Sequence, residues 1–81
     1  MSIEEEEVIH IPPKEPNYLY VAENIVLSRK DVDNVKSTIG EKFAMLEYFP
    51  IMKVAFLWTT DKLTSEELSK LQELYGFYEP L

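Results

Sequence analysis

A run of mostly apolar residues, Ile51–Trp58, limits the folds open to this chain more than any other feature of the sequence. Its residue types favour a β-strand, and the side chains that alternate along such a strand are apolar on both sides. A strand of this kind is stable only when both faces are covered. We therefore expect a central strand, or a strand at a dimer interface. The residues assigned to the core or dimer contact are Met52, Val54, Phe56 and Trp58, with Ala55 and Leu57 on the other side.

Two segments carry complete helix-start signals, one before this strand and one after it. Ser28 precedes Asp31 by three residues, and Thr64 precedes Glu67 by three residues, which is the spacing of a capping box. Apolar residues then follow at helical spacing, and a glycine ends each stripe. The expected stripes are Val32, Val35 and Ile39 before Gly40, and Leu68, Leu71, Leu74 and Tyr75 before Gly76.

Three further elements complete the expected domain. Tyr18–Ala22 favours a strand, and Phe77–Glu79 favours a short last strand. Between Glu41 and Pro50 the spacing of Phe43, Leu46 and Phe49 predicts a second short helix that the proline ends. The sequence thus predicts an α+β fold, a small mixed β-sheet with about three short helices packed on it, over residues 17–81.

Residues 1–16 are predicted to form an acidic, proline-rich N-terminal arm. Glu4–Glu7 is a run of four carboxylates, which is typical of a solvated tail rather than a metal site. Val8–Ile11 has strand character, and the prolines after it separate it from the domain. We expect this segment to pair as an edge strand, on its own sheet or on that of a neighbouring molecule.

Length and composition exclude several kinds of site. With no cysteine and one histidine, His10, a chain of 81 residues cannot build disulfides, thiolate metal sites or a multi-histidine site. We expect no metal and no cofactor, and a structural or surface role for His10. A chain this short hides only about 60–65% of the surface of its unfolded form, so we expect a homodimer to add burial.

The charge of the chain argues against direct binding of nucleic acid. The net charge is −7, the glutamate run supplies four of those charges, and Arg29 is the only arginine. Phosphate binding needs clustered lysine and arginine, so direct binding of nucleic acid is not expected, while a basic surface on another protein stays open as a partner. No apolar run is long enough to span a membrane, and we expect a cytoplasmic protein. Few amides and no cysteine fit a thermophile.

One segment has the ingredients of a phosphate site. Ser37–Lys42 combines hydroxyls, a glycine and the start of the expected second helix, which makes its residues candidate ligand-binding groups. Glu41 places a negative charge where the anion would bind, so a plain hinge between two helices is the favoured interpretation. The candidates are Ser37, Thr38, Gly40, Glu41 and Lys42.

The same segment resembles the Ser-(small)-Ile-Gly-His-Glu pattern of the viral ring nucleases. These small dimeric α+β proteins of crenarchaeal viruses degrade cyclic tetra-adenylate and so blunt type III CRISPR immunity. Tyr18–Ser28, Val54–Trp58, Leu63–Leu68 and Phe77-Tyr78 follow the family's order, so the resemblance covers about residues 18–79. It implies a homodimer of viral origin in the host cytoplasm.

The departures from the family decide the functional expectation. Glu41 stands where the family has its histidine, and Thr59–Lys62 has no counterpart of the family's arginine and glutamate. Without them the chain lacks a proton-transfer group and a bidentate phosphate contact, so we assign no catalytic residue and expect no enzyme. The leading hypothesis is a non-catalytic, homodimeric protein-interaction domain, with itself or a host protein as partner. The alternatives are residual ring-nuclease activity or cyclic-oligonucleotide binding across a dimer, and an acidic decoy for a basic nucleic-acid-binding protein.

Overall fold

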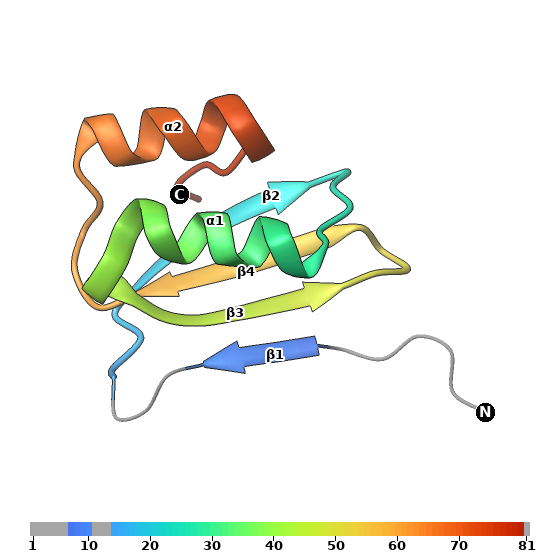
Figure 1. Ribbon diagram of the computed structural model, residues 1–81, viewed down its shortest axis with the longest axis horizontal. Helices are drawn as coiled ribbons and strands as arrows, with labels where there is room; N and C mark the ends of the chain where they lie inside the picture. The colour runs from blue at the N-terminus through green and yellow to red at the C-terminus, as the bar shows by residue number, and fades with distance from the viewer. Residues whose placement is uncertain (1–6, 11–13, 81) are drawn as a thin grey trace.

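The computed structural model of the protein describes residues 7–10 and 14–80, and its architecture confirms the α+β class. Figure 1 shows two helices side by side over one face of a small sheet. The elements are β1 (Glu7–His10), β2 (Tyr18–Glu23), α1 (Arg29–Ile39), a 3₁₀ turn η1 (Gly40–Lys42), β3 (Phe43–Phe49), β4 (Val54–Thr59) and α2 (Ser65–Tyr75).

The strands lie in the order β1-β3-β4-β2, and each neighbouring pair is antiparallel. The α+β class is as predicted, but the prediction of a mixed sheet is wrong, because the described strands pair only in the antiparallel direction. β2 and β3, which α1 connects, run parallel to each other with β4 inserted between them, a split β-α-β arrangement. β4 is thus a central strand, as its two apolar sides predict.

Both α-helices begin where the capping signals place them. The Ser28 hydroxyl accepts a hydrogen bond from the Asp31 amide at 3.2 Å, and the Asp31 carboxylate accepts one from the Ser28 amide at 2.9 Å. Thr64 and Glu67 make the same reciprocal pair at 3.1 Å and 2.9 Å. Each box satisfies two backbone donors that a helix start leaves open.

The predicted helix over residues 41–49 is wrong, because this segment forms η1 and then β3. The register with β4 shifts between Phe43 and Met45, so one extra residue is inserted into β3 there. In a regular strand Phe43 and Leu46 would point to opposite faces, but across this bulge both are buried on the helix side. The bulge therefore gives this strand buried residues three positions apart, a spacing that is also typical of a helix.

Three smaller expectations are also corrected. Ile51–Lys53 is a turn rather than the start of a strand, and Met52 is 68% exposed at its tip. The expected last strand is reduced to one bridge, between Tyr78 and Val21. Leu74 is exposed on α2, so the buried stripe of this helix rests on Leu71.

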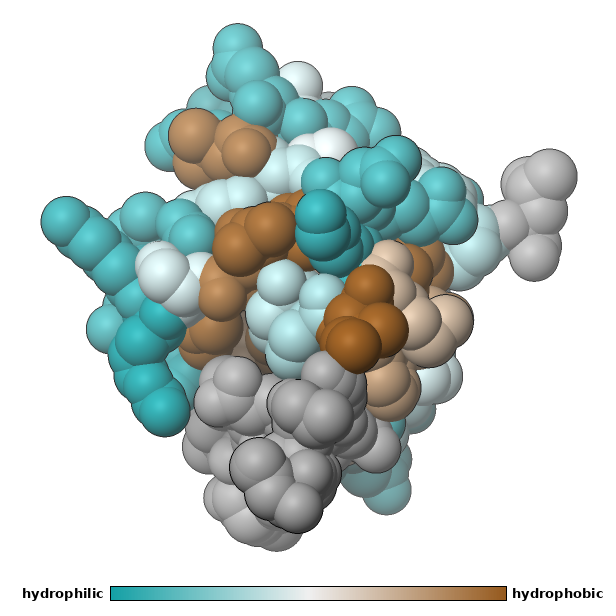
Figure 2. Space-filling view, turned by 90° about the vertical axis from the view of Figure 1, so that its right-hand side faces the viewer, coloured by the Kyte–Doolittle hydropathy of each residue, from teal (hydrophilic) through white to brown (hydrophobic). Residues whose placement is uncertain are grey.

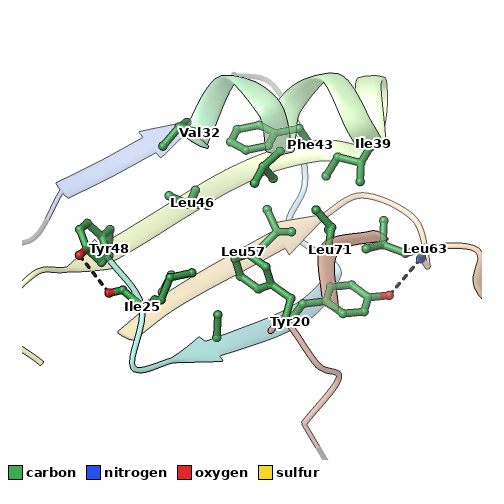
Figure 3. Close-up of a cluster of buried hydrophobic side chains, with 14 residues drawn as sticks. Tyr20, Ile25, Val32, Ile39, Phe43, Leu46, Tyr48, Leu57, Leu63 and Leu71 are labelled. Carbon is green, nitrogen blue, oxygen red and sulfur yellow. Dashed lines mark hydrogen bonds between the residues drawn. The ribbon is translucent and has the colours of Figure 1, made fainter. Parts of the chain in front are cut away.

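A single buried cluster fills the space between the helices and the sheet (Figure 3). Two tyrosines within it tie down loops through their hydroxyls. The Tyr20 hydroxyl accepts a hydrogen bond from the Leu63 amide at 3.0 Å, and the Tyr48 hydroxyl donates one to the Ile25 carbonyl at 3.1 Å. Because both bonds are buried, each connects a loop to the sheet without leaving a polar group unpaired.

The expected edge strand of the arm is confirmed in part. Glu7–His10 pairs with β3 of its own sheet, with Val8 opposite Glu47 and His10 opposite Met45 in the register. Glu4–Glu6 and residues 11–13 lie outside the described residues.

Candidate functional site

The face of the sheet turned away from the helices is the candidate site. Residues paired across neighbouring antiparallel strands point to the same side, so the register groups the outward side chains into rows. The rows are Met45, Trp58 and Leu19; Glu47, Phe56 and Val21; and Phe49, Val54 and Glu23. We call these residues the open face.

Apolar side chains dominate the open face. An antiparallel sheet with one covered face usually presents polar side chains on the other. Here the charged members are Glu23 and Glu47, and the rest are aliphatic, aromatic or methionine. Phe49 and Phe56 meet edge to face, with ring centroids 5.7 Å apart. Most of these side chains are half-buried, whereas Val21 is buried and Glu23 is exposed.

Glu47 is the polar group in the middle row. The Trp58 indole Nε1 donates a hydrogen bond to Glu47 Oε1 at 3.4 Å. Within residues 14–80 the Glu47 carboxylate makes no ion pair, and no lysine or arginine occupies the outward positions of β2, β3 and β4. Among these three strands, the open face therefore carries a carboxylate without a lysine or arginine beside it.

The apolar surface continues at one end of the sheet. The turn between β3 and β4 exposes Ile51 and Met52, and the loop between β2 and α1 exposes Val26, each at 66–72%. Figure 2 looks at this end and shows hydrophobic side chains gathered on it and bordered by hydrophilic ones. Because this turn joins Phe49 to Val54, its tip adjoins the open face.

The residues predicted to bind a phosphate lie where α1 leads through η1 into β3, rather than between two helices. Gly40 ends α1 with φ 59°, and its amide donates to the Lys36 carbonyl as a helix cap. The Thr38 hydroxyl donates to the Asn34 carbonyl at 2.8 Å, while Ser37 is exposed. The turn η1 that follows leads into a strand, so the helix N-terminus on which the phosphate interpretation depended is absent from this segment.

The charged residues of this junction make structural contacts, and Lys42 pairs with α2. Lys42 Nζ lies 2.7 Å from Glu67 Oε1, an ion pair that joins η1 to the first turn of α2. The hydrogen bond from Lys42, together with the one from the Thr64 amide, lowers the pKa of the Glu67 carboxyl. The Glu41 side chain is exposed, and its carbonyl accepts a hydrogen bond from Lys14 Nζ at 2.5 Å. The segment is a hinge between a helix and a strand rather than between two helices.

A shallow hollow of about 390 Å³ lies beside this junction, between α1 and α2. Its lining offers one cation and several neutral polar groups, without a carboxylate, histidine or thiol. The lining residues are Asn34, Ser37, Thr38, Lys70 and Leu74. This set provides no acid–base pair for catalysis.

Neither a metal-binding cluster nor a membrane-spanning helix occurs among the described residues. No group of three or more histidine, cysteine, aspartate or glutamate side chains comes close enough to hold a metal ion within that part of the chain. Neither described helix combines the length and the apolar character that crossing a membrane requires.

The open face joins predicted residues with residues that the sequence analysis missed. Val54, Phe56 and Trp58 share one side of β4, as predicted, whereas Met52 leaves the strand for the turn. The residues missed are Leu19, Met45, Glu47 and Phe49, the last three because their segment was interpreted as a helix. The adjacent aromatic residues Tyr48 and Phe49 favour a strand and were the signal available, although this segment shows no regular alternation of polar and apolar residues.

Comparisons of the chain with protein-family models, with curated proteins and with solved structures found no match.

Proposed function

We propose that this chain is a non-catalytic protein-interaction domain that binds its partner through the open face of its sheet. The observation that carries the proposal is the unequal cover of the sheet. Both sides of β4 are apolar, but α1 and α2 cover only one of them. An apolar sheet face that the helices leave uncovered, with aromatic and aliphatic side chains only half-buried, is characteristic of a binding site.

The shape and charge of the surface narrow the class of ligand. Small molecules bind in concave pockets that enclose most of their surface, and the hollow of that kind described above lies between the helices rather than on the open face. The acidic chain, with a net charge of −7, also disfavours nucleic acid and anionic lipid as partners. A protein surface or an extended peptide fits best.

The other hypotheses from the sequence receive less support. The resemblance to viral ring nucleases supplies no catalytic residue, and Lys42, the cation at that site, is already paired with Glu67. An acidic decoy needs its carboxylates on one face, but Glu47 lies on the open face while Asp31 and Glu67 cap the helices. A homodimer through the open face remains a prediction that light scattering at micromolar concentration tests.

Selection from a random peptide library displayed on phage tests the proposal without a known partner. We expect peptides that bind the purified protein and lose at least about tenfold in affinity when Phe56 is replaced by Ser, because the substitution removes an aromatic contact from the middle row. Leu74→Ser is the matched control, since Leu74 is an exposed apolar residue on α2. Circular dichroism confirms that both variants remain folded.

Peptides that bind both variants as tightly as the wild type would show that binding occurs elsewhere. A library that yields no binder would also count against an interaction domain of this kind.

A further inference from the structure

We propose that the partner presents an apolar segment with one lysine or arginine side chain, and that this cation pairs with Glu47. The inference rests on the proposed function and names the chemistry of the partner at the same surface.

The position of Glu47 is the first argument. Met45 and Phe49 flank it on β3, two residues away on either side, and Phe56 lies directly opposite on β4. The indole Nε1 of Trp58 reaches the carboxylate from the neighbouring row at 3.4 Å. A partner that covers these apolar side chains must therefore also cover the carboxylate between them.

The cost of covering a carboxylate is the second argument. A charged group that loses water and gains no partner is strongly unfavourable, and one indole N–H replaces only part of its hydration. An ammonium or guanidinium group supplies the missing charge and further hydrogen bonds. The aromatic rings of Phe56 and Trp58 border the same position and also attract a cation.

A second copy of this chain does not supply that cation. In a two-fold interface the same patch lies on both sides, so two copies packed through the middle row bring Glu47 close to its counterpart. The outward positions of β2, β3 and β4 contain glutamates and no lysine or arginine. The register of β1 places Val8 opposite Glu47 and adds one basic residue, His10, which stands opposite Met45. No lysine or arginine of these strands therefore offsets the repulsion. Charge complementarity thus favours a different, basic partner.

The size of the surface favours a short segment. Strands about 4.8 Å apart and residues about 3.4 Å long give three strands and five residue positions a footprint of about 15 Å by about 17 Å. That is on the order of 250 Å², whereas a stable complex between folded proteins buries about 800 Å² on each partner. An extended segment of about five residues is about 17 Å long, which matches the length of the open face along its strands.

Trp58 provides a reporter for this proposal, because it is the only tryptophan in the chain and lies on the open face. Three peptides differ at one position: acetyl-Leu-Phe-X-Phe-Leu-amide, where X is arginine, its neutral isostere citrulline, or glutamate. Binding is measured by Trp58 fluorescence and by the NMR shift of its indole N–H.

We expect the arginine peptide to bind at least about tenfold more tightly than the citrulline peptide, and the glutamate peptide to bind most weakly. Glu47→Gln reduces the preference for arginine to within about twofold. Glu73→Gln is the matched control, because Glu73 is an exposed carboxylate on α2 and lies outside the open face. This variant keeps the preference.

Three results overturn the proposal. Equal affinity for all three peptides, with loss of binding in Phe56→Ser, would show that the partner needs no cation, while the open face would still be the binding surface. No binding of any of the three peptides at 1 mM shows that such a segment is not enough. Self-association that becomes tighter in Glu47→Gln identifies a second copy of the chain as the occupant.

Discussion

The two faces of the sheet are built by the same strands and have similar apolar character, but they differ in what covers them. Along β4, Leu57 is fully buried beneath the helices, while Phe56 and Trp58 on the other side keep part of their surface in water. Burial on the first face stabilises the fold, and exposure on the second leaves apolar surface available to a partner. The apolar character of a strand therefore shows that it will be covered, but not by which molecule.

The largest effect is expected from one substitution on each face of β4. Leu57→Ala should lower the free energy of unfolding by about 2–5 kcal/mol, because it leaves a cavity in the core. Phe56→Ala should cost about 1 kcal/mol, since part of its ring is already in water. Urea denaturation of the two variants measures both values. Equal losses would contradict the distinction between the faces.

Tyrosine hydroxyls give a second contrast. Tyr20→Phe leaves the buried Leu63 amide without its acceptor, so we expect a loss of about 1–3 kcal/mol. Tyr78→Phe removes an exposed hydrogen bond to Glu23, and we expect a change below about 0.5 kcal/mol. Thermal unfolding followed by circular dichroism compares them. A larger loss in the Tyr78 variant would be inconsistent with these two positions.

Acid titration tests the two carboxylates that cap the helices, Asp31 and Glu67. Hydrogen bonds from the Ser28 amide and hydroxyl lower the pKa of Asp31, and that from Lys42 lowers the pKa of Glu67. A lowered folded-state pKa stabilises the protein above the unfolded value of about 4, and this contribution disappears as the pH falls through the folded-state value. Stability should therefore drop as the pH falls below about 4.

Variants at neutral pH distinguish Glu67 from Glu47. Glu67→Gln should cost about 1 kcal/mol, since it weakens a capping box and an ion pair. Glu47→Gln should change stability by less than about 0.5 kcal/mol, because the carboxylate holds no structural charge pair. Denaturation of each variant at pH 7 and pH 3 decides between them, and an equal pH dependence of wild type and Glu67→Gln would contradict the role of Glu67.

The smallest effect is expected at the junction that resembles the ring nucleases. Cyclic tetra-adenylate should shift the melting temperature by less than about 1 °C, because the Gly40 amide and Lys42 already have partners. Differential scanning fluorimetry of the wild type and Glu41→His measures this. A clear shift or cleavage with the wild type would restore the cyclic-oligonucleotide hypothesis.

Helix starts and ends could be predicted from the sequence because their physics is local. Ser28 and Thr64 act within three residues of themselves, and Gly76 adopts φ 80° at the end of α2. β3 could not be predicted in the same way, because its bulge places Phe43 and Leu46 on one face at a spacing that also fits a helix. Pairing with β4 decides between the two structures, and that pairing is a tertiary contact.

The candidate site was predictable in its central strand only. Phe56 and Trp58 were assigned from the alternation in β4, but the neighbours that complete the surface, Glu47 above all, depended on the strand order. The sequence also could not show that both helices lie over the same face. This arrangement is what leaves the other face open.

The most direct test of the central claim is an NMR titration of the ¹⁵N-labelled protein with a peptide selected from the library. If the open face is the binding surface, the largest shifts should occur at the Trp58 indole and at amides of β3 and β4, while Asn34 and Lys70 beside the hollow between the helices stay unchanged. The largest shifts at Asn34 and Lys70, with the Trp58 indole unmoved, would contradict it.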